Sequence, residues 1–333
     1  MPRFCPVLFA IAMTVLGQPS LWAQRVCPVT ESGDLLQDKL PIIKAAIPRR
    51  FSQTGRDGFV QPGAGEMSAW GVLTSSMLVG DVSEACRIID ANAFPYTVIQ
   101  YSDTSDVITV KMYNILQEDI PPLGPIAKGW GTYIFNPASI TSLSIEIPHP
   151  LFDDLTPEEG IDTFRQLDAR TLLMAGTHRY ANQASSSCQP DPVGNIADVA
   201  HNIDNMFEMT HEAIAIQPPG TLFIQLHGNA NSSCSNVAAF VSNGTTTPGS
   251  RVNGIVDCVN LGPFIAEAAT PESLCILKGT TNVQGRFSNG SPNLCSENAQ
   301  AASEQFIHIE QNSEIRNPAN RQALIDALRC ALP

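Results

Sequence analysis

The segment LSIEIPH (residues 143–149) is a short apolar run that ends in a histidine. Two more runs of the same kind follow it, TLLMAGTH (171–178) and TLFIQLH (221–227). Apolar runs of this length, bounded by Gly, Pro and polar residues, are typical of buried strands. Because ligands bind outside the carboxyl ends of parallel strands, we expect His149, His178 and His227 to lie near one edge of a sheet.

Helical patterns alternate with these strands. Residues 34–47 fit a helix that is kinked at Pro41, and Asp81 is expected to cap a short helix through residue 89. Thr156 is expected to cap a helix that runs to about residue 167, and residues 196–214 predict an amphipathic helix.

Further strands are expected along the rest of the chain. A hairpin is predicted from YTVIQY (96–101) and VITVKMYNIL (107–116), and single strands from residues 129–135, 238–242, 254–259 and 306–311. Strands that alternate with helices predict an α/β fold with a mixed, largely parallel sheet flanked by helices. The many Gly, Pro, Ser and Asn residues predict that this fold is loop-rich.

The beginning of the chain has the layout of a cleavable signal peptide. One cation, Arg3, precedes an apolar stretch from Phe4 to Leu16, and the small residue Ala23 stands before Gln24. We therefore expect a signal peptide at 1–23 and an exported protein, secreted or periplasmic, with no membrane partner after cleavage. Residues 24–333 are expected to form a single domain, with 24–141 as its N-terminal part and 142–333 carrying the site.

Cysteine usage also predicts export. Removal of Cys5 with the signal leaves an even number of cysteines, which predicts up to four disulfide bonds in an exported chain. They are Cys27, Cys86, Cys188, Cys234, Cys258, Cys275, Cys295 and Cys330. No CxxC pair occurs, which argues against a cysteine-ligated zinc site or a thioredoxin-like motif.

The acidic balance narrows the class of partner. The full chain has a formal net charge of −13, and loss of Arg3 makes the exported form one unit more negative. Such a charge argues against nucleic acid or an anionic membrane as the main partner. A small-molecule or peptide-like substrate is the remaining expectation.

The histidines point to metal chemistry. All six lie between residues 149 and 308. The segment HPLFDDLT adds Asp153 and Asp154 four and five residues after His149, although both acids could instead belong to a turn before the helix. Two histidines and one carboxylate form the ligand set of a catalytic zinc that keeps one coordination position open. Glu310, in the apolar strand FIHIEQ, is a candidate general base, or else a surface residue of an alternating strand.

Three segments carry a resemblance to a known family. IEIPHPLFDDLT, FIQLHGN and FIHIEQNSEIR resemble the zinc-dependent amidohydrolases related to N-formylglutamate amidohydrolase, poly-γ-glutamate hydrolase and zinc carboxypeptidases. The resemblance implies one Zn²⁺ per chain held by His149, Asp153 and His227, with Glu310 as the catalytic acid and base. The carboxypeptidase pattern has Glu at the position of Phe152, so Asp154, Glu158 and Glu159 stay open as alternatives to Asp153.

The same resemblance suggests how a substrate carboxylate is bound. GTHRYAN is similar to the arginine-bearing segment of these relatives, which makes Arg179 a candidate clamp, and Arg316 is a second one. Structural ion pairs are the alternative role for both arginines. His178 is expected either to bind substrate or to compete for the third ligand position.

Three functions remain open. The first is an exported zinc-dependent hydrolase that cleaves an amide or peptide bond near a carboxylate. The second is a metal-dependent phosphoesterase, since His and Asp clusters also serve two-metal sites. The third is a non-catalytic exported binding protein of the same fold. No GxSxG, P-loop or GxGxxG motif occurs to favour a serine hydrolase, a nucleotidase or a dinucleotide-binding enzyme.

Overall fold

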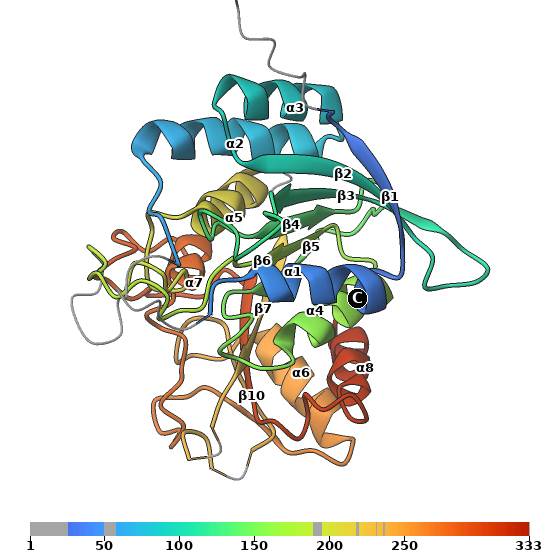
Figure 1. The fold of residues 1–333 in the computed structure, drawn as a ribbon. Helices are drawn as coiled ribbons and strands as arrows, with labels where there is room; N and C mark the ends of the chain where they lie inside the picture. Colours follow the sequence, from blue (N-terminus) through green and yellow to red (C-terminus); the bar gives the residue numbers. More distant parts are fainter. Residues whose placement is uncertain are drawn as a thin grey trace, which may run out of the picture.

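The protein forms one ten-stranded sheet with helices on both faces (Figure 1). The computed structural model describes residues 26–49, 58–188, 195–217, 220–230, 232–235 and 237–332, and the expected signal peptide lies outside them. The strands are β1 (Val29–Gly33), β2 (Tyr96–Asp103), β3 (Lys111–Glu118), β4 (Thr132–Phe135), β5 (Leu143–Ile147), β6 (Thr171–Met174), β7 (Leu222–Gly228), β8 (Ala239–Ser242), β9 (Ala266–Ala268) and β10 (Phe306–Gln311).

The strand order is β1-β2-β3-β4-β6-β5-β7-β10-β8-β9. The neighbours β6, β5, β7 and β10 in the middle of the sheet all run parallel. β5, β7 and β10 are apolar and almost wholly buried, as expected of parallel strands that are covered on both faces. The mixed, largely parallel α/β fold is therefore confirmed.

The core consists of two main buried clusters, one on each face of the sheet. The helices are the π-helical turn η1 (Leu35–Lys39), α1 (Leu40–Ala46), α2 (Ala64–Leu78), α3 (Val82–Ala91), α4 (Thr156–Gln166), α5 (Met206–Ile216), α6 (Ser250–Asn260), α7 (Val283–Ser288) and α8 (Gln322–Ala331). One buried cluster joins α1, α4, α6 and α8 to the sheet, and a second joins α2, α3 and α5 to it. In Figure 1 the α2–α3 pair and the α6–α8 pair lie at opposite ends of the view.

Several local predictions are confirmed. The break expected at Pro41 is the junction between η1 and α1. Asp81 caps α3, because its side chain accepts a hydrogen bond from the amide of Glu84. The predicted hairpin is the antiparallel pair β2–β3, although its second strand begins only at Lys111.

Other local predictions are wrong. The strand expected at 254–259 is part of α6, in which Val252, Ile255 and Val259 are buried at helical spacing. The helix expected at 196–214 begins only at Met206, because Asn205 caps it by accepting from the amide of Glu208. His201 therefore lies in a loop.

The cap expected for α4 is also wrong. Leu155, with φ of 69°, is the N-cap residue, and Thr156 is the first residue of the helix. The Thr156 hydroxyl donates to the carbonyl of Asp153 at 2.7 Å. Thr156 thereby holds the turn before the helix.

Four disulfide bonds staple the fold, as the even cysteine count predicts. They are Cys27–Cys86, Cys188–Cys295, Cys234–Cys275 and Cys258–Cys330. Disulfides at this density are typical of chains that fold in an oxidising compartment. Within the part of the chain that the structure describes, no helix has the length and apolar character needed to cross a membrane.

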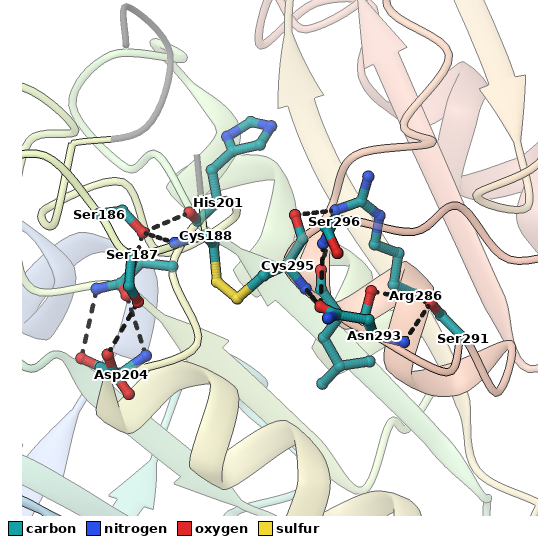
Figure 2. The surroundings of a disulfide bond; sticks show 12 residues. Ser186, Ser187, Cys188, His201, Asp204, Arg286, Ser291, Asn293, Cys295 and Ser296 are labelled. Carbon is teal, nitrogen blue, oxygen red and sulfur yellow. Dashed lines mark hydrogen bonds between the residues drawn. A yellow bond between two sulfur atoms is a disulfide. The ribbon is translucent and has the colours of Figure 1, made fainter. Parts of the chain in front are cut away.

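The Cys188–Cys295 bond supports the loop that contains His201. Figure 2 shows it joining the segment at Ser186–Cys188 to the segment at Asn293–Ser296. Ser186 Oγ donates to the carbonyl of His201 at 3.1 Å and accepts from the amide of Cys188. The disulfide therefore ties the 195–205 loop to the C-terminal part of the chain.

We predict that the double variant Cys188→Ser/Cys295→Ser loses about 2–4 kcal/mol of unfolding free energy, because the unfolded chain gains entropy when a long loop is opened. Denaturant titration measures this loss. Hydrogen exchange of the amides at 195–202 should also accelerate. The matched control Cys27→Ser/Cys86→Ser should lose stability without that acceleration, and equal exchange in both variants would contradict the supporting role of Cys188–Cys295.

Candidate metal centre

His149 and Asp153 lie in one helical turn directly after β5. The amide of Asp153 donates to the carbonyl of His149 at 2.9 Å, which closes the turn. Residues four apart in such a turn project to the same side. His149 Nδ1 and Asp153 Oδ2 are consequently 3.2 Å apart, and both side chains are buried.

The neighbouring acids point elsewhere. Asp154 is exposed, and Glu158 forms an ion pair with Lys44 at 2.6 Å. Glu159 is buried and accepts from Gln311 Nε2 at 2.8 Å. Among the acids of this segment, Asp153 is therefore the one that lies next to His149.

His227, near the end of β7, completes the group. Its Nδ1 lies 3.3 Å from the same Asp153 Oδ2, and its ring centroid lies 5.0 Å from that of His149. One donor atom from each of the three residues falls within 4.8 Å of the other two. The carboxyl ends of β5 and β7 thus bring together side chains that are 78 residues apart in sequence.

These three atoms have the geometry of a zinc ligand set. In a tetrahedral site with ligand bonds of about 2.0–2.2 Å, neighbouring ligand atoms lie about 3.3–3.6 Å apart. His149 Nδ1 and His227 Nδ1 lie 3.2 and 3.3 Å from Asp153 Oδ2, which is close to that range. Two imidazole nitrogens and one carboxylate oxygen are also the donor types of catalytic zinc. The residues present therefore fit a divalent ion.

The pKa values reflect the strong coupling of the three groups. Burial raises the pKa of Asp153, but the close rings of His149 and His227 outweigh this and hold that pKa below its usual value. Burial and Arg179 lower the pKa of His149, whereas Asp198 and Asp153 raise it, and the net direction is upward. Burial lowers the pKa of His227 to about 4. A buried, ionised carboxylate beside a neutral imidazole favours a cation between them.

Glu310 lies beside this group. It pairs with His227 in the register of β7 and β10, and its carboxylate is within 4.8 Å of a ring nitrogen of His227. Burial, reinforced by the charge of Asp153, raises the pKa of Glu310 well above its usual value. Among the described residues, no group forms a hydrogen bond with its buried Oε2.

A second group of possible metal ligands overlaps the first. His227, His308 and Glu310 also bring donor atoms within 4.8 Å of one another. However, Nδ1 of His227 faces Asp153, and its Nε2 contacts Gln225 Oε1 at 2.7 Å. Because both ring nitrogens of His227 are engaged, the geometry favours one ion.

Asp198 is a member of the site that the sequence reasoning missed. Its Oδ1 lies 2.9 Å from His149 Nε2, and its Oδ2 contacts Arg179 and lies 3.2 Å from His201 Nδ1. A carboxylate on the far nitrogen of a ligand histidine orients the ring toward the metal. The local sequence feature that could have indicated Asp198 is the spacing D-V-A-H at 198–201. The helix expected at 196–214 includes these residues and assigns them to a helix face instead.

The predicted substrate-binding residues are near the site but already have partners. Arg179 pairs with Asp198 and lies over the ring of Phe152. Arg316 donates to the carbonyls of Asp154 and Asn312, and its guanidinium packs directly on Gly228. His178 is not in either of the donor groups found among the described residues, and its ring contacts those of Phe152 and Tyr180.

A pocket of about 330 Å³ adjoins the segment between His149 and Asp153. It is lined by Lys44, Arg49, Pro150, Leu151, Asp154 and His178. Lys44 and Arg49 are cationic, but Asp154 also lines the pocket and Lys44 is paired with Glu158. Arg49 is therefore the cationic side chain of this lining that is left to contact an anionic ligand.

No protein-family model matches the chain, and no curated protein matches it in sequence. Several solved structures are similar to parts of it, among them the following three. A bacteriophage poly-gamma-glutamate hydrolase is 16% identical over 57% of this chain and 82% of its own, with a TM-score of 0.34. The zinc-free form of YNDL is 13% identical over 59% and 89%, with a TM-score of 0.31. A candidate metallopeptidase from Shewanella baltica OS155 is 12% identical over 60% and 81%, with a TM-score of 0.34.

These structures include a poly-gamma-glutamate hydrolase, one of the enzymes that the three sequence segments resemble.

We predict that the metal-free protein loses stability as the pH falls from about 6.5 to about 4. In this window the unfolded chain protonates His227 at its ordinary pKa, whereas the folded protein keeps it neutral. One such group changes the unfolding free energy by about 1.4 kcal/mol per pH unit. Denaturant titrations of the wild type and His227→Gln, in the presence of a chelator, measure it. A pH-independent difference between the two proteins would contradict the low pKa of His227.

Proposed function

We propose that this chain is an exported hydrolase that uses one zinc ion to cleave an amide or peptide bond near a carboxylate. The observation that carries the proposal is the convergence of His149 Nδ1, His227 Nδ1 and Asp153 Oδ2, with Glu310 adjacent. Three protein ligands leave one tetrahedral position for water or substrate, which is the arrangement of catalytic rather than structural zinc. The four disulfides support export.

The ion and Glu310 have complementary roles. A zinc ion supplies Lewis acidity, which polarises a substrate carbonyl and makes water acidic near neutral pH. Glu310 takes a proton from the attacking water and delivers it to the leaving nitrogen. Its raised pKa suits both transfers, because efficient acid-base catalysts have pKa values near the working pH. The unpartnered Oε2 of Glu310 is the atom that we assign to this proton.

The position of Arg49 supports a substrate that carries a carboxylate. Arg49 lines the pocket beside His178, whereas Lys44 is paired with Glu158 and Arg179 with Asp198. We therefore assign recognition of the carboxylate to Arg49 and His178, and we assign Arg179 to the support of Asp198. Arg316 lies against Gly228, directly after His227, and is assigned to contacts with the reacting group. A peptide-like substrate fits this division of roles.

We predict that Glu310→Gln retains zinc but loses turnover by about 10²–10⁴-fold, because the amide cannot accept a proton from the attacking water. His149→Ala should lose the zinc as well. Elemental analysis and hydrolysis of a panel of N-acyl amino acids and polyglutamate measure the two effects, and one zinc per chain is expected in the wild type. Unchanged turnover in Glu310→Gln would contradict the catalytic role. Two metal ions per chain would instead favour a phosphoesterase.

We predict that Arg49→Ala raises KM about tenfold for substrates with a free carboxylate and leaves kcat nearly unchanged, because it removes a charge-assisted contact away from the reacting bond. The corresponding amide-capped substrates should be unaffected. Arg87→Ala, on the exposed side of α3, is the matched control and should change neither parameter. An equal loss for capped and free substrates would contradict carboxylate recognition by Arg49.

A further inference from the structure

A buried amide links the ligand His227 to a carboxylate that the proposed reaction does not use. Gln225 precedes His227 by two residues in β7, and Glu146 is its register partner in β5. Gln225 Nε2 lies 3.0 Å from Glu146 Oε2, and Gln225 Oε1 lies 2.7 Å from His227 Nε2. None of the three side chains is more than a few per cent exposed.

The chemistry of these groups fixes the direction of each hydrogen bond. A carboxylate only accepts, so the nitrogen of the Gln225 amide must face Glu146. Gln225 Oε1 then faces His227, and it also accepts from Asn282 Nδ2. An amide oxygen cannot donate. His227 Nε2 must therefore carry a hydrogen and donate it to Gln225.

This direction determines the tautomer of His227. A histidine that binds a metal is neutral and carries one ring hydrogen. With that hydrogen on Nε2, the lone pair is on Nδ1. Nδ1 faces Asp153 Oδ2 at 3.3 Å, so two acceptors point at each other across a space that suits a cation.

Glu146 is itself held from its other side. Its Oε1 lies 2.7 Å from His211 Nδ1, and His211 Nε2 lies 3.0 Å from Ser288 Oγ. The His211 ring packs on Phe223 with centroids 3.9 Å apart. Glu146, His211 and Ser288 are connected in the same way as the acid, histidine and serine of a catalytic triad. Here the second oxygen of Glu146 also accepts a hydrogen bond from Gln225. The chain of hydrogen bonds therefore continues to the proposed metal ligand.

We propose that Glu146 is a positioning residue for the metal centre, which acts through Gln225 to direct the Nδ1 lone pair of His227 toward the ion. The inference rests on the proposed metal site, and it adds which atom of His227 binds and which residues enforce that choice. Glu146 fixes the nitrogen end of the Gln225 amide, and Asn282 fixes the oxygen end, because Asn282 Oδ1 accepts from the amide of Gly285 and its Nδ2 donates to Gln225 Oε1. A histidine free of this constraint could present either nitrogen.

The first test needs no variant. ¹⁵N NMR of the metal-free wild type distinguishes Nε2–H from Nδ1–H imidazole, and we expect His227 to be the Nε2–H tautomer. A predominant Nδ1–H form would overturn the proposal. This readout does not involve turnover, so it stands apart from success or failure of the hydrolase proposal.

The second test changes the anchor. In the double variant Glu146→Gln/Asn282→Asp the two groups that fix Gln225 exchange their donor and acceptor roles, and the new carboxylate at position 282 can still accept from the amide of Gly285. Gln225 can then reverse, and we expect a mixture of His227 tautomers with zinc affinity about 10–100-fold weaker. Ser288→Ala removes the far end of the chain but keeps Glu146, and should leave both readouts unchanged. A wild-type tautomer and affinity in this double variant would overturn the role of Glu146. An equal effect of Ser288→Ala would overturn its position as the anchor.

Discussion

Two imidazole nitrogens share one buried oxygen of Asp153, and the rest of the molecule is arranged to hold them there. A buried carboxylate without a positive or hydrogen-bonding partner costs several kcal/mol, so this contact is stable only if the surrounding groups compensate. Parallel packing of β5, β7 and β10 brings the ends of these strands to one place, and with them the side chains that surround Asp153. His149, Asp153 and His227 are all buried.

The polar groups around the three ligands fix the orientation of the ligand side chains. Asp198 lies on the far nitrogen of His149, and Gln225 lies on the far nitrogen of His227. Each far contact leaves the near nitrogen turned toward Asp153. Arg179 offsets the charge of Asp198, and burial raises the pKa of Glu310 beside the three ligands. The disulfide at Cys188 holds the loop from which Asp198 reaches the site.

Much of this arrangement could be predicted from local patterns. Apolar runs that end in a histidine identify β5, β7 and their shared edge, and a glutamate in an apolar strand identifies Glu310. The contacts of Asp198 and Glu146 could not be predicted, because each joins segments far apart in sequence. The run at 254–259 favours a strand in the sequence but forms part of a helix, because short apolar segments fit either element equally well. Gln225 and Glu146 carry the same signal as Glu310, a polar residue within an apolar strand, and could have been recognised by it.

Anomalous diffraction at the zinc absorption edge, from crystals of protein purified with zinc, addresses the shared coordination directly. We expect a single strong peak about 2.0–2.2 Å from His149 Nδ1, His227 Nδ1 and Asp153 Oδ2. A peak that involves Nε2 of either histidine, or zinc bound elsewhere in the chain, would contradict the convergence on which the proposed chemistry depends.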